Sequence, residues 1–210
     1  MDRYLGTWFE ICRLPLKWED EHASDITATY SLDPDGLIKV DNRCIDGGGK
    51  PVQAIGQAFP TDAGNARLKV SFLPQYLRWL PFTKGDYWVM RISPDYTVAL
   101  VGTPDRSNLW LLSRTPQLPG EVCEDYLSSA RAEGFDLAAL ITPLQSGNIV
   151  SDTEIAAAQA DSRCLLERSP PPFRNESGTR ALRFTAIRRT DADNVGQARC
   201  AVAHGTICVT

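Results

Sequence analysis

Hydrophobic and polar residues alternate over eight short stretches between residues 6 and 116, and turn-forming residues separate them. A period of two places one face of a strand in a core and the other toward solvent. The expected strands are Thr7–Arg13, Ile26–Leu32, Leu37–Cys44, Val52–Phe59, Ala66–Phe72, Tyr87–Ile92, Thr97–Val101 and Leu109–Arg114. Asp33-Pro34-Asp35-Gly36 is a clear turn, because proline fixes one φ and glycine accepts a positive one. Short connections without helices predict an all-β, antiparallel up-and-down sheet of eight strands.

One helix is expected after the last of these strands. Pro119 opens the segment, acidic residues follow it, and Gly134 can end the helix in a left-handed conformation. The apolar stripe of this helix consists of Val122, Cys123, Tyr126, Leu127 and Ala130. Such a stripe predicts that the helix packs against the outside of the sheet.

The first and last expected strands carry a pair of residues that can meet. The first opens on Gly6-Thr7-Trp8, and the last ends at Arg114. If the sheet closes, these strands are neighbours, and the Arg114 guanidinium can lie on the Trp8 indole. A cation over an indole face contributes roughly 0.5–2 kcal/mol. We therefore predict a structural role for Gly6, Trp8 and Arg114, apart from ligand binding.

Several short sequence motifs, taken in their order along the chain, resemble those of one protein family. They are Tyr4-Leu5-Gly6-Thr7-Trp8-Phe9-Glu10, Ala28-Thr29-Tyr30-Ser31-Leu32, Leu68-Lys69-Val70-Ser71-Phe72, Ala99-Leu100-Val101 and the segment 109–116, Leu-Trp-Leu-Leu-Ser-Arg-Thr-Pro. Over roughly residues 3–145 the chain resembles the lipocalins, and among them the bacterial outer-membrane lipocalins and apolipoprotein D. The resemblance implies an eight-stranded barrel, which is wide enough to be filled by side chains or to hold one small ligand.

The resemblance also implies ligand contacts inside the barrel. Its pocket positions are occupied here by Tyr30, Asn42 and Trp110. Alternation from Trp8 directs Glu10 and Cys12 inward as well, and we add Glu10 and Phe72 to the candidate ligand contacts. Ordinary core packing is the alternative for each of these side chains.

The function that this resemblance favours is the binding, storage or transport of a fatty acid or lysophospholipid, linked to the cell envelope. A lipid isomerase that uses an inward thiol, Cys12 or Cys44, is the alternative. A third alternative is an interaction module that works through the C-terminal segment. The six cysteines include no C-x-x-C, and the region of the barrel offers no Ser-His-Asp set. We therefore expect a non-enzymatic protein with no catalytic residues, no metal site and no cofactor.

Net charge and hydropathy limit the classes of partner that the protein can be expected to have. The net charge is −4 and the isoelectric point is about 5.2, which argues against a nucleic-acid partner. No run of eighteen apolar residues is present, and the sequence as given begins without a signal peptide. Location is therefore open: cytoplasmic as the sequence stands, or cell envelope if the N-terminus is incomplete. We expect a monomer or a homodimer.

The expected connection from Pro74 to Asp86 is unusually apolar. It carries the large side chains of Tyr76, Leu77, Trp79, Leu80 and Phe82. Connections are normally polar, so these residues are predicted either to plug one end of the barrel or pack on a second subunit, or to form an apolar lip that touches a membrane surface.

Composition changes near residue 146. All Trp, Tyr and Lys residues precede it, and Ser169-Pro170-Pro171-Pro172 follows it. Only Ile155–Leu166 has the length and propensity of a helix. We therefore predict two parts: a ligand-binding barrel with its trailing helix (1–145), and a largely disordered, dispensable extension (146–210).

Overall fold

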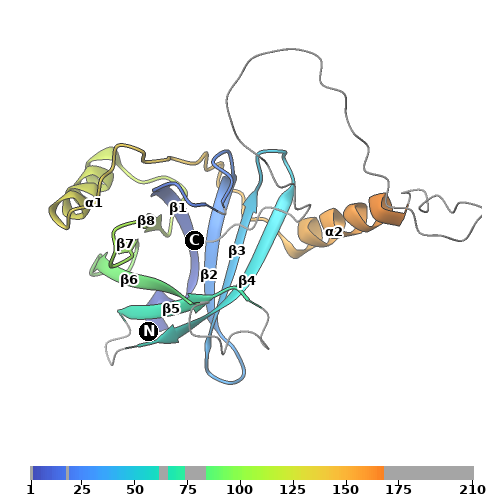
Figure 1. The fold of residues 1–210 in the computed structure, drawn as a ribbon, viewed down its shortest axis with the longest axis horizontal. Coiled ribbons are helices and arrows are strands. Elements are labelled where there is room, and N and C mark those ends of the chain that lie inside the picture. Colours follow the sequence, from blue (N-terminus) through green and yellow to red (C-terminus); the bar gives the residue numbers. More distant parts are fainter. Residues whose placement is uncertain (1, 18, 62–65, 74–83, 168–210) are drawn as a thin grey trace, which may run out of the picture. The chain divides into compact units, whose positions relative to one another are not determined.

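The computed structural model describes residues 2–17, 19–61, 66–73 and 84–167. Its strands are β1 (Gly6–Arg13), β2 (Ser24–Leu32), β3 (Ile38–Ile45), β4 (Pro51–Pro60), β5 (Arg67–Ser71), β6 (Gly85–Ile92), β7 (Val98–Gly102) and β8 (Leu109–Ser113), preceded by the 3-10 turn η1 (Asp2–Tyr4). Each strand pairs antiparallel with the next, and β8 pairs with β1, so the sheet closes into a barrel (Figure 1). The predicted all-β, eight-stranded up-and-down barrel is confirmed.

The turn between β2 and β3 has the expected chemistry. Gly36 has a φ of +75° and donates its N–H to the Asp33 carbonyl at 2.9 Å. The Asp33 carboxylate accepts the N–H groups of Asp35 and Leu37. Aspartate at the start of the turn and glycine at its end thus satisfy the backbone and fix the register of β2 with β3.

The interior of the barrel is mainly apolar and aromatic. Its buried cluster contains Tyr4, Trp8, Leu16, Ala28, Tyr30, Ile38, Val40, Ala58, Leu68, Val70, Tyr87, Ala99, Val101, Trp110 and Leu112. Most of these residues alternate along their strands with side chains that lie on the outer surface. The alternation seen in the sequence therefore defines the two faces of most strands.

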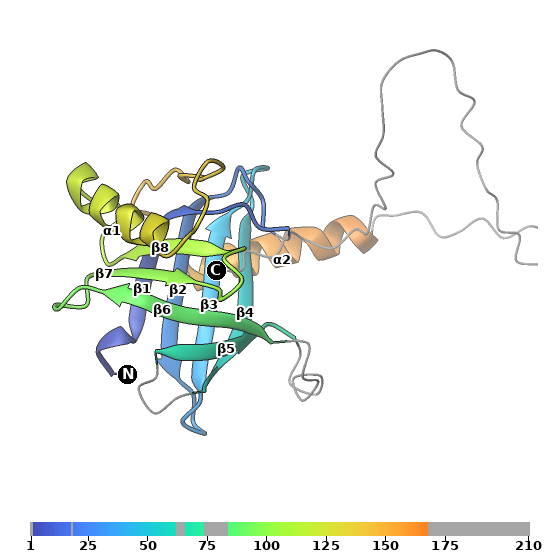
Figure 2. The ribbon, with the colours of Figure 1, turned by 60° about the vertical axis from the view of Figure 1, so that its left-hand side comes forward.

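Helix α1 (Gly120–Ala132) covers the outside of the barrel beside β8 (Figure 2). Tyr126, Leu127 and Ala130 are buried in a second cluster, which includes outward residues of β7 and β8. Gly134 has a φ of +89°, and the Phe135 N–H returns to the Ala130 carbonyl at 3.1 Å. The predicted apolar stripe and left-handed glycine end are both confirmed.

A β-bulge in β1 changes which side chains face inward. Glu10 pairs with Leu112, but the next pair is Cys12 with Leu111, followed by Arg13 with Trp110. Residues directly opposite in an antiparallel pair share a face of the sheet. Cys12 therefore lies on the outer face, in the cluster beneath α1. The predicted inward position of Cys12 is wrong, because the bulge inserts one extra residue into the alternation.

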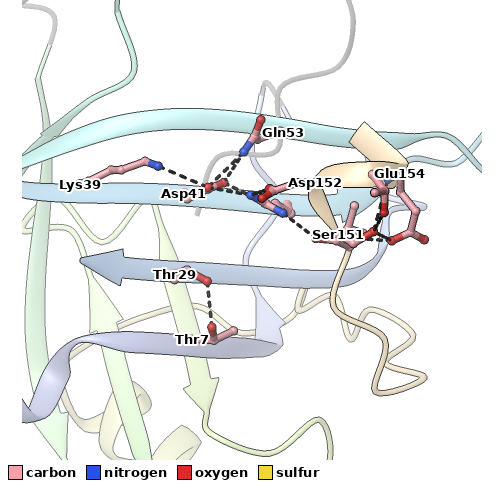
Figure 3. Close-up of polar contacts among 11 residues, drawn as sticks. Thr7, Thr29, Lys39, Asp41, Gln53, Ser151, Asp152 and Glu154 are labelled. Atoms are coloured by element: carbon pink, nitrogen blue, oxygen red, sulfur yellow. Dashed lines mark hydrogen bonds and ion pairs between the residues drawn. The ribbon is translucent and has the colours of Figure 1, made fainter. Parts of the chain in front are cut away.

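Helix α2 (Asp152–Glu167) follows a segment that lies on the barrel. The segment and the first turns of the helix are anchored by Val150 and Ile155, which are 0% and 6% exposed. Arg43 on β3 donates to the Val150 carbonyl at 2.9 Å and pairs with Asp152. Ser151 and Glu154 form a reciprocal capping pair at the start of the helix (Figure 3). The helix expected at 155–166 is present and begins three residues earlier, because this capping pair precedes it.

The chain divides into two compact units, and the boundary falls within α2. Among the described residues, those up to Ala158 belong to the first unit, and those from Gln159 belong to the second. The described part of the second unit is the end of α2. In the described part of the chain, no helix combines the length and hydropathy needed to span a membrane.

Candidate functional site: the barrel interior

Trp8 and Arg114 meet as the sequence predicted. The guanidinium carbon of Arg114 lies 3.8 Å from the centre of the Trp8 ring. Arg114 also donates to the carbonyl oxygens of Thr7 and Leu5, both at 2.8 Å. The Trp8 indole is fully buried, and its N–H donates to the Tyr4 carbonyl at 2.8 Å. Arg114 therefore ties η1, β1 and β8 together.

Three tyrosine hydroxyls form a chain inside the barrel. The hydroxyl of Tyr87 lies 2.8 Å from that of Tyr4 and 2.8 Å from that of Tyr30. The Tyr30 and Tyr87 rings are 6.2 Å apart, and the Trp110 ring lies 6.2 Å beyond Tyr87. Burial raises the pKa values of Tyr4 and Tyr87, which keeps their hydroxyls protonated. Tyr30 and Trp110, two of the predicted contacts, thus belong to one continuous aromatic wall.

Asn42 and Trp110 carry polar atoms that have no partner in the described part of the chain. The Asn42 side chain is fully buried, and neither its oxygen nor its nitrogen makes a hydrogen bond with any described residue. The Trp110 indole nitrogen is also buried, and no described residue accepts from it. Buried polar groups are nearly always hydrogen-bonded, and an unsatisfied one costs about 1–3 kcal/mol. The interior wall therefore presents two donors and one acceptor for a bound molecule or ordered water.

A buried ion cluster lies where β1 leads into the β1–β2 connection. Arg13 donates to Glu10 Oε1 at 3.1 Å, and its Nε lies 3.5 Å from Glu19 Oε2. Its Nη2 also donates to the Asp20 carbonyl at 2.8 Å. The cluster fastens the β1–β2 connection to the barrel. Arg13 and Glu19 were not identified from the sequence, because plain alternation places Arg13 outside and a connection carries no periodic signal.

Glu10 faces inward as predicted, and its chemistry is unusual. Its side chain is fully buried, and its Oε2 has no hydrogen-bond partner in the described residues. Burial raises the pKa of Glu10 to about 7, although the neighbouring Arg13 guanidinium opposes the rise. A carboxyl group in this position can exchange a proton near neutral pH.

The two thiols considered for catalysis lie in different places. Cys44 is 1% exposed and packs with Ala23 and Ile26, at an inward position of β3. Cys12 lies outside the barrel, and burial raises the pKa of its thiol. Its outward position removes Cys12 from the interior as a candidate nucleophile.

Phe72 is the last predicted contact that the structure describes on this wall. Phe72 is partly buried against the interior cluster. A Cβ added to Gly56 would lie 2.8 Å from the Phe72 ring, so the missing side chain makes room for that ring. The lip residues Tyr76, Leu77, Trp79, Leu80 and Phe82 fall outside the described residues. Among the residues that the structure describes, no group of three or more His, Cys, Asp or Glu side chains could hold a metal ion.

Comparisons with solved structures support the fold. Lobster apocrustacyanin A1 superposes with a TM-score of 0.57 at 13% identity, over 74% of this chain and 84% of that chain. Apocrustacyanin C1 gives the same TM-score at 12% identity, over 73% of this chain and 84% of that one. At these identities the likeness concerns the fold alone.

Comparisons of sequence identify the family. Temperature-induced lipocalin-1 of Arabidopsis thaliana is 42% identical over 149 residues, covering 70% of this chain and 79% of that protein. Outer membrane lipoprotein Blc of Escherichia coli K12 is 40% identical over 148 residues, covering 70% and 79%. Bovine apolipoprotein D is 30% identical over 145 residues, covering 63% and 71%. Because the family model for the lipocalin-like domain also matches residues 1–145, the chain belongs to the lipocalin family.

Proposed function

We propose that the barrel interior binds a fatty acid or a lysophospholipid. Lipocalins bind small hydrophobic ligands, and the finer choice rests on one observation in this chain. Asn42 and Trp110 hold buried polar atoms that have no partner among the described residues, inside a mainly apolar and aromatic wall. A purely hydrocarbon ligand would leave these atoms unpaired. An acyl lipid brings a long apolar chain together with carboxylate, ester or hydroxyl oxygens that can accept from Asn42 and Trp110.

The apolar part of the ligand supplies most of the driving force. Each buried methylene contributes roughly 0.8 kcal/mol before ordering and desolvation are subtracted. The polar atoms then select among ligands of similar length, since leaving a buried donor unpaired costs about 1–3 kcal/mol. Tyr30 and Phe72 contribute wall area, and Glu10 adds a polar atom at a second position.

The experiment is a titration of the delipidated protein with palmitic acid and with a palmitoyl lysophospholipid, followed by tryptophan emission and by native mass spectrometry. Replacing Trp110 with Phe keeps the ring but removes the indole N–H, and we expect affinity to fall about tenfold. Ile55→Ala serves as the control, because Ile55 is 46% exposed on the outer face of β4. Equal affinity of the Trp110→Phe and Ile55→Ala proteins for both lipids would contradict the proposal.

Binding is preferred to catalysis. The isomerase alternative required an inward thiol, and Cys12 lies outside the barrel. Cys44 remains inward, so Cys44→Ser tests what is left of that alternative. We expect neither the wild-type protein nor Cys44→Ser to convert lipid. We also expect the two proteins to bind lipid with the same affinity.

For cellular location, we extend the proposal to the cell envelope, since an outer membrane lipoprotein of Escherichia coli is among the similar proteins. Fractionation of the native host, with detection of the full chain, tests this extension.

The apolar segment 74–86 is proposed as the part that touches the membrane. If this segment touches the membrane, joint replacement of Trp79 and Leu80 by Ser should abolish flotation of the protein with vesicles. Light scattering decides between monomer and homodimer.

A further inference from the structure

Two free cysteines from distant parts of the chain meet on the outer wall of the barrel. Cys12 belongs to β1 and Cys123 to the first turn of α1. Both are free thiols, both side chains belong to the cluster beneath α1, and each thiol lies close enough to the other to shift its pKa. Cys12 is 2% exposed, whereas Cys123 is only partly buried.

Local structure brings the two sulfurs together. The bulge between Glu10 and Cys12 turns Cys12 outward, toward the cluster that α1 covers. On α1, Cys123 and Tyr126 lie three residues apart and Leu127 follows four residues after Cys123, so all three share one face of the helix. Tyr126 and Leu127 are buried against the wall, and they hold Cys123 on the side that faces Cys12.

We propose that Cys12 and Cys123 form a site of reversible oxidation, in which a disulfide fastens α1 to β1. Hydrogen peroxide is the oxidant that fits the arrangement. The more accessible Cys123 sulfur attacks one peroxide oxygen, becomes a sulfenic acid and releases one water. The Cys12 sulfur then attacks the Cys123 sulfur and displaces the hydroxyl group, which leaves as a second water with the Cys12 proton. Overall the two thiols lose two electrons and two protons, and the peroxide is reduced to water.

The surroundings favour the pairing over further oxidation. Cys12 belongs to the cluster against which Cys123 packs, so its thiol meets a sulfenic acid at Cys123 before a second peroxide does. Cys44 packs with Ala23 and Ile26 in a separate cluster, which keeps it out of this exchange. Burial raises the pKa of both thiols of the pair, so the first step is slow and requires an oxidising environment.

The test is peptide mapping of the full chain after oxidation in native buffer. The reduced protein is treated with a small excess of hydrogen peroxide, alkylated and digested with trypsin. Cys12 lies in the peptide Tyr4–Arg13, and Cys123 lies in the peptide Thr115–Arg131, with one cysteine in each. We expect these peptides to be joined and to separate again on reduction. We expect the melting temperature to rise by about 5–15 °C on oxidation, because the link closes a long loop.

Matched variants distinguish a specific pair from general thiol oxidation. Cys44→Ser should retain the Cys12–Cys123 link and the rise in melting temperature. Cys123→Ala should lose both, while its reduced form melts near the wild-type temperature. Recovery of unlinked Cys12 and Cys123 peptides from the oxidised native protein would overturn the proposal. Formation of the link only in denaturant would overturn it as well.

Discussion

The guanidinium carbon of Arg114 lies 3.8 Å from the centre of the Trp8 ring, although 105 residues lie between the two in the sequence. This contact joins the first strand to the last. It lies where η1 meets the barrel, since Arg114 also donates to the Tyr4 and Leu5 carbonyls. One side chain thus connects the two strands that close the barrel and the turn that precedes them.

We predict that Arg114→Ala lowers the free energy of unfolding by about 2–3 kcal/mol. The substitution removes the cation over Trp8 and leaves several carbonyl oxygens without their donor. Arg114→Lys should recover only part of the loss, because an ammonium group cannot reproduce the planar fork of the guanidinium. Urea denaturation measures both changes. Lipid affinity of the folded protein should hardly move, and a large loss of affinity at unchanged stability would contradict a structural role.

Asn42→Leu is predicted to separate stability from binding. Leucine has a similar size and removes two buried polar atoms that lack partners in the described residues. The ligand-free protein should therefore become about 1 kcal/mol more stable, while affinity for a fatty acid or lysophospholipid falls about tenfold. Ser31→Val, on the exposed outer face of β2, is the control for a polar-to-apolar change. A destabilised Asn42→Leu protein would show that the amide is satisfied by bound water in the empty barrel.

The strands, the first long turn and α1 could be predicted from the sequence because their signals are local. Alternation defines the faces of most strands, and Asp33 with Gly36 defines a turn within four residues. The bulge at Glu10 and Cys12 leaves no such signal, because neither residue differs from an ordinary strand residue. One inserted residue reverses the two side chains that follow, so Cys12 was assigned to the interior and Arg13 was overlooked.

The candidate site likewise contains some features that the sequence predicts and others that it does not. Trp8 and Arg114 could be paired from the sequence, because closure of the sheet makes their strands neighbours. Tyr30, Asn42 and Trp110 came from the family resemblance, and their roles in ligand binding remain proposals. The tyrosine hydroxyl chain and the contact between Cys12 and Cys123 depend on three-dimensional positions of distant residues. No local sequence pattern predicts such contacts.

Glu10 is predicted to make stability depend on pH in a defined direction. Its pKa is about 7 in the folded protein, against an ordinary value of 4.5. Between these values the folded protein holds a proton that the unfolded chain releases, so this contribution is complete below pH 4.5 and is lost as pH rises toward 7. The stability of wild type relative to Glu10→Gln should fall across this window, with a slope of at most about 1.4 kcal/mol per pH unit.

Urea denaturation of both proteins at several pH values measures this slope. Glu133→Gln provides the control, because Glu133 is exposed beyond the end of α1. Its stability difference from wild type should not change over the same range. A Glu10→Gln difference that is flat with pH, or that grows in the opposite direction, would show that Arg13 keeps Glu10 ionised.

The last prediction concerns where the chain can be shortened. The composition placed a boundary at residue 145, and that boundary remains a prediction. The contacts of the following segment indicate a later cut, since Val150 is 0% exposed and Ile155 is 6% exposed. Ser146 also donates its backbone N–H to the Asp25 carboxylate at 2.7 Å. A chain that ends at Gln145 should lose about 2–4 kcal/mol of stability, because two buried aliphatic side chains are removed. A chain that ends at Glu167 should melt at the wild-type temperature.

Neighbouring residues in this segment offer a point-mutation test that leaves the chain length unchanged. Val150→Ala should destabilise the protein by about 1–3 kcal/mol, because it leaves a cavity against the barrel. Ile149→Ala removes a larger side chain, yet Ile149 is 49% exposed, so its effect should be within about 0.5 kcal/mol of zero. Thermal and urea unfolding of both proteins compare the two positions directly. Equal effects at 149 and 150, together with full stability of the chain that ends at Gln145, would restore the boundary at residue 145.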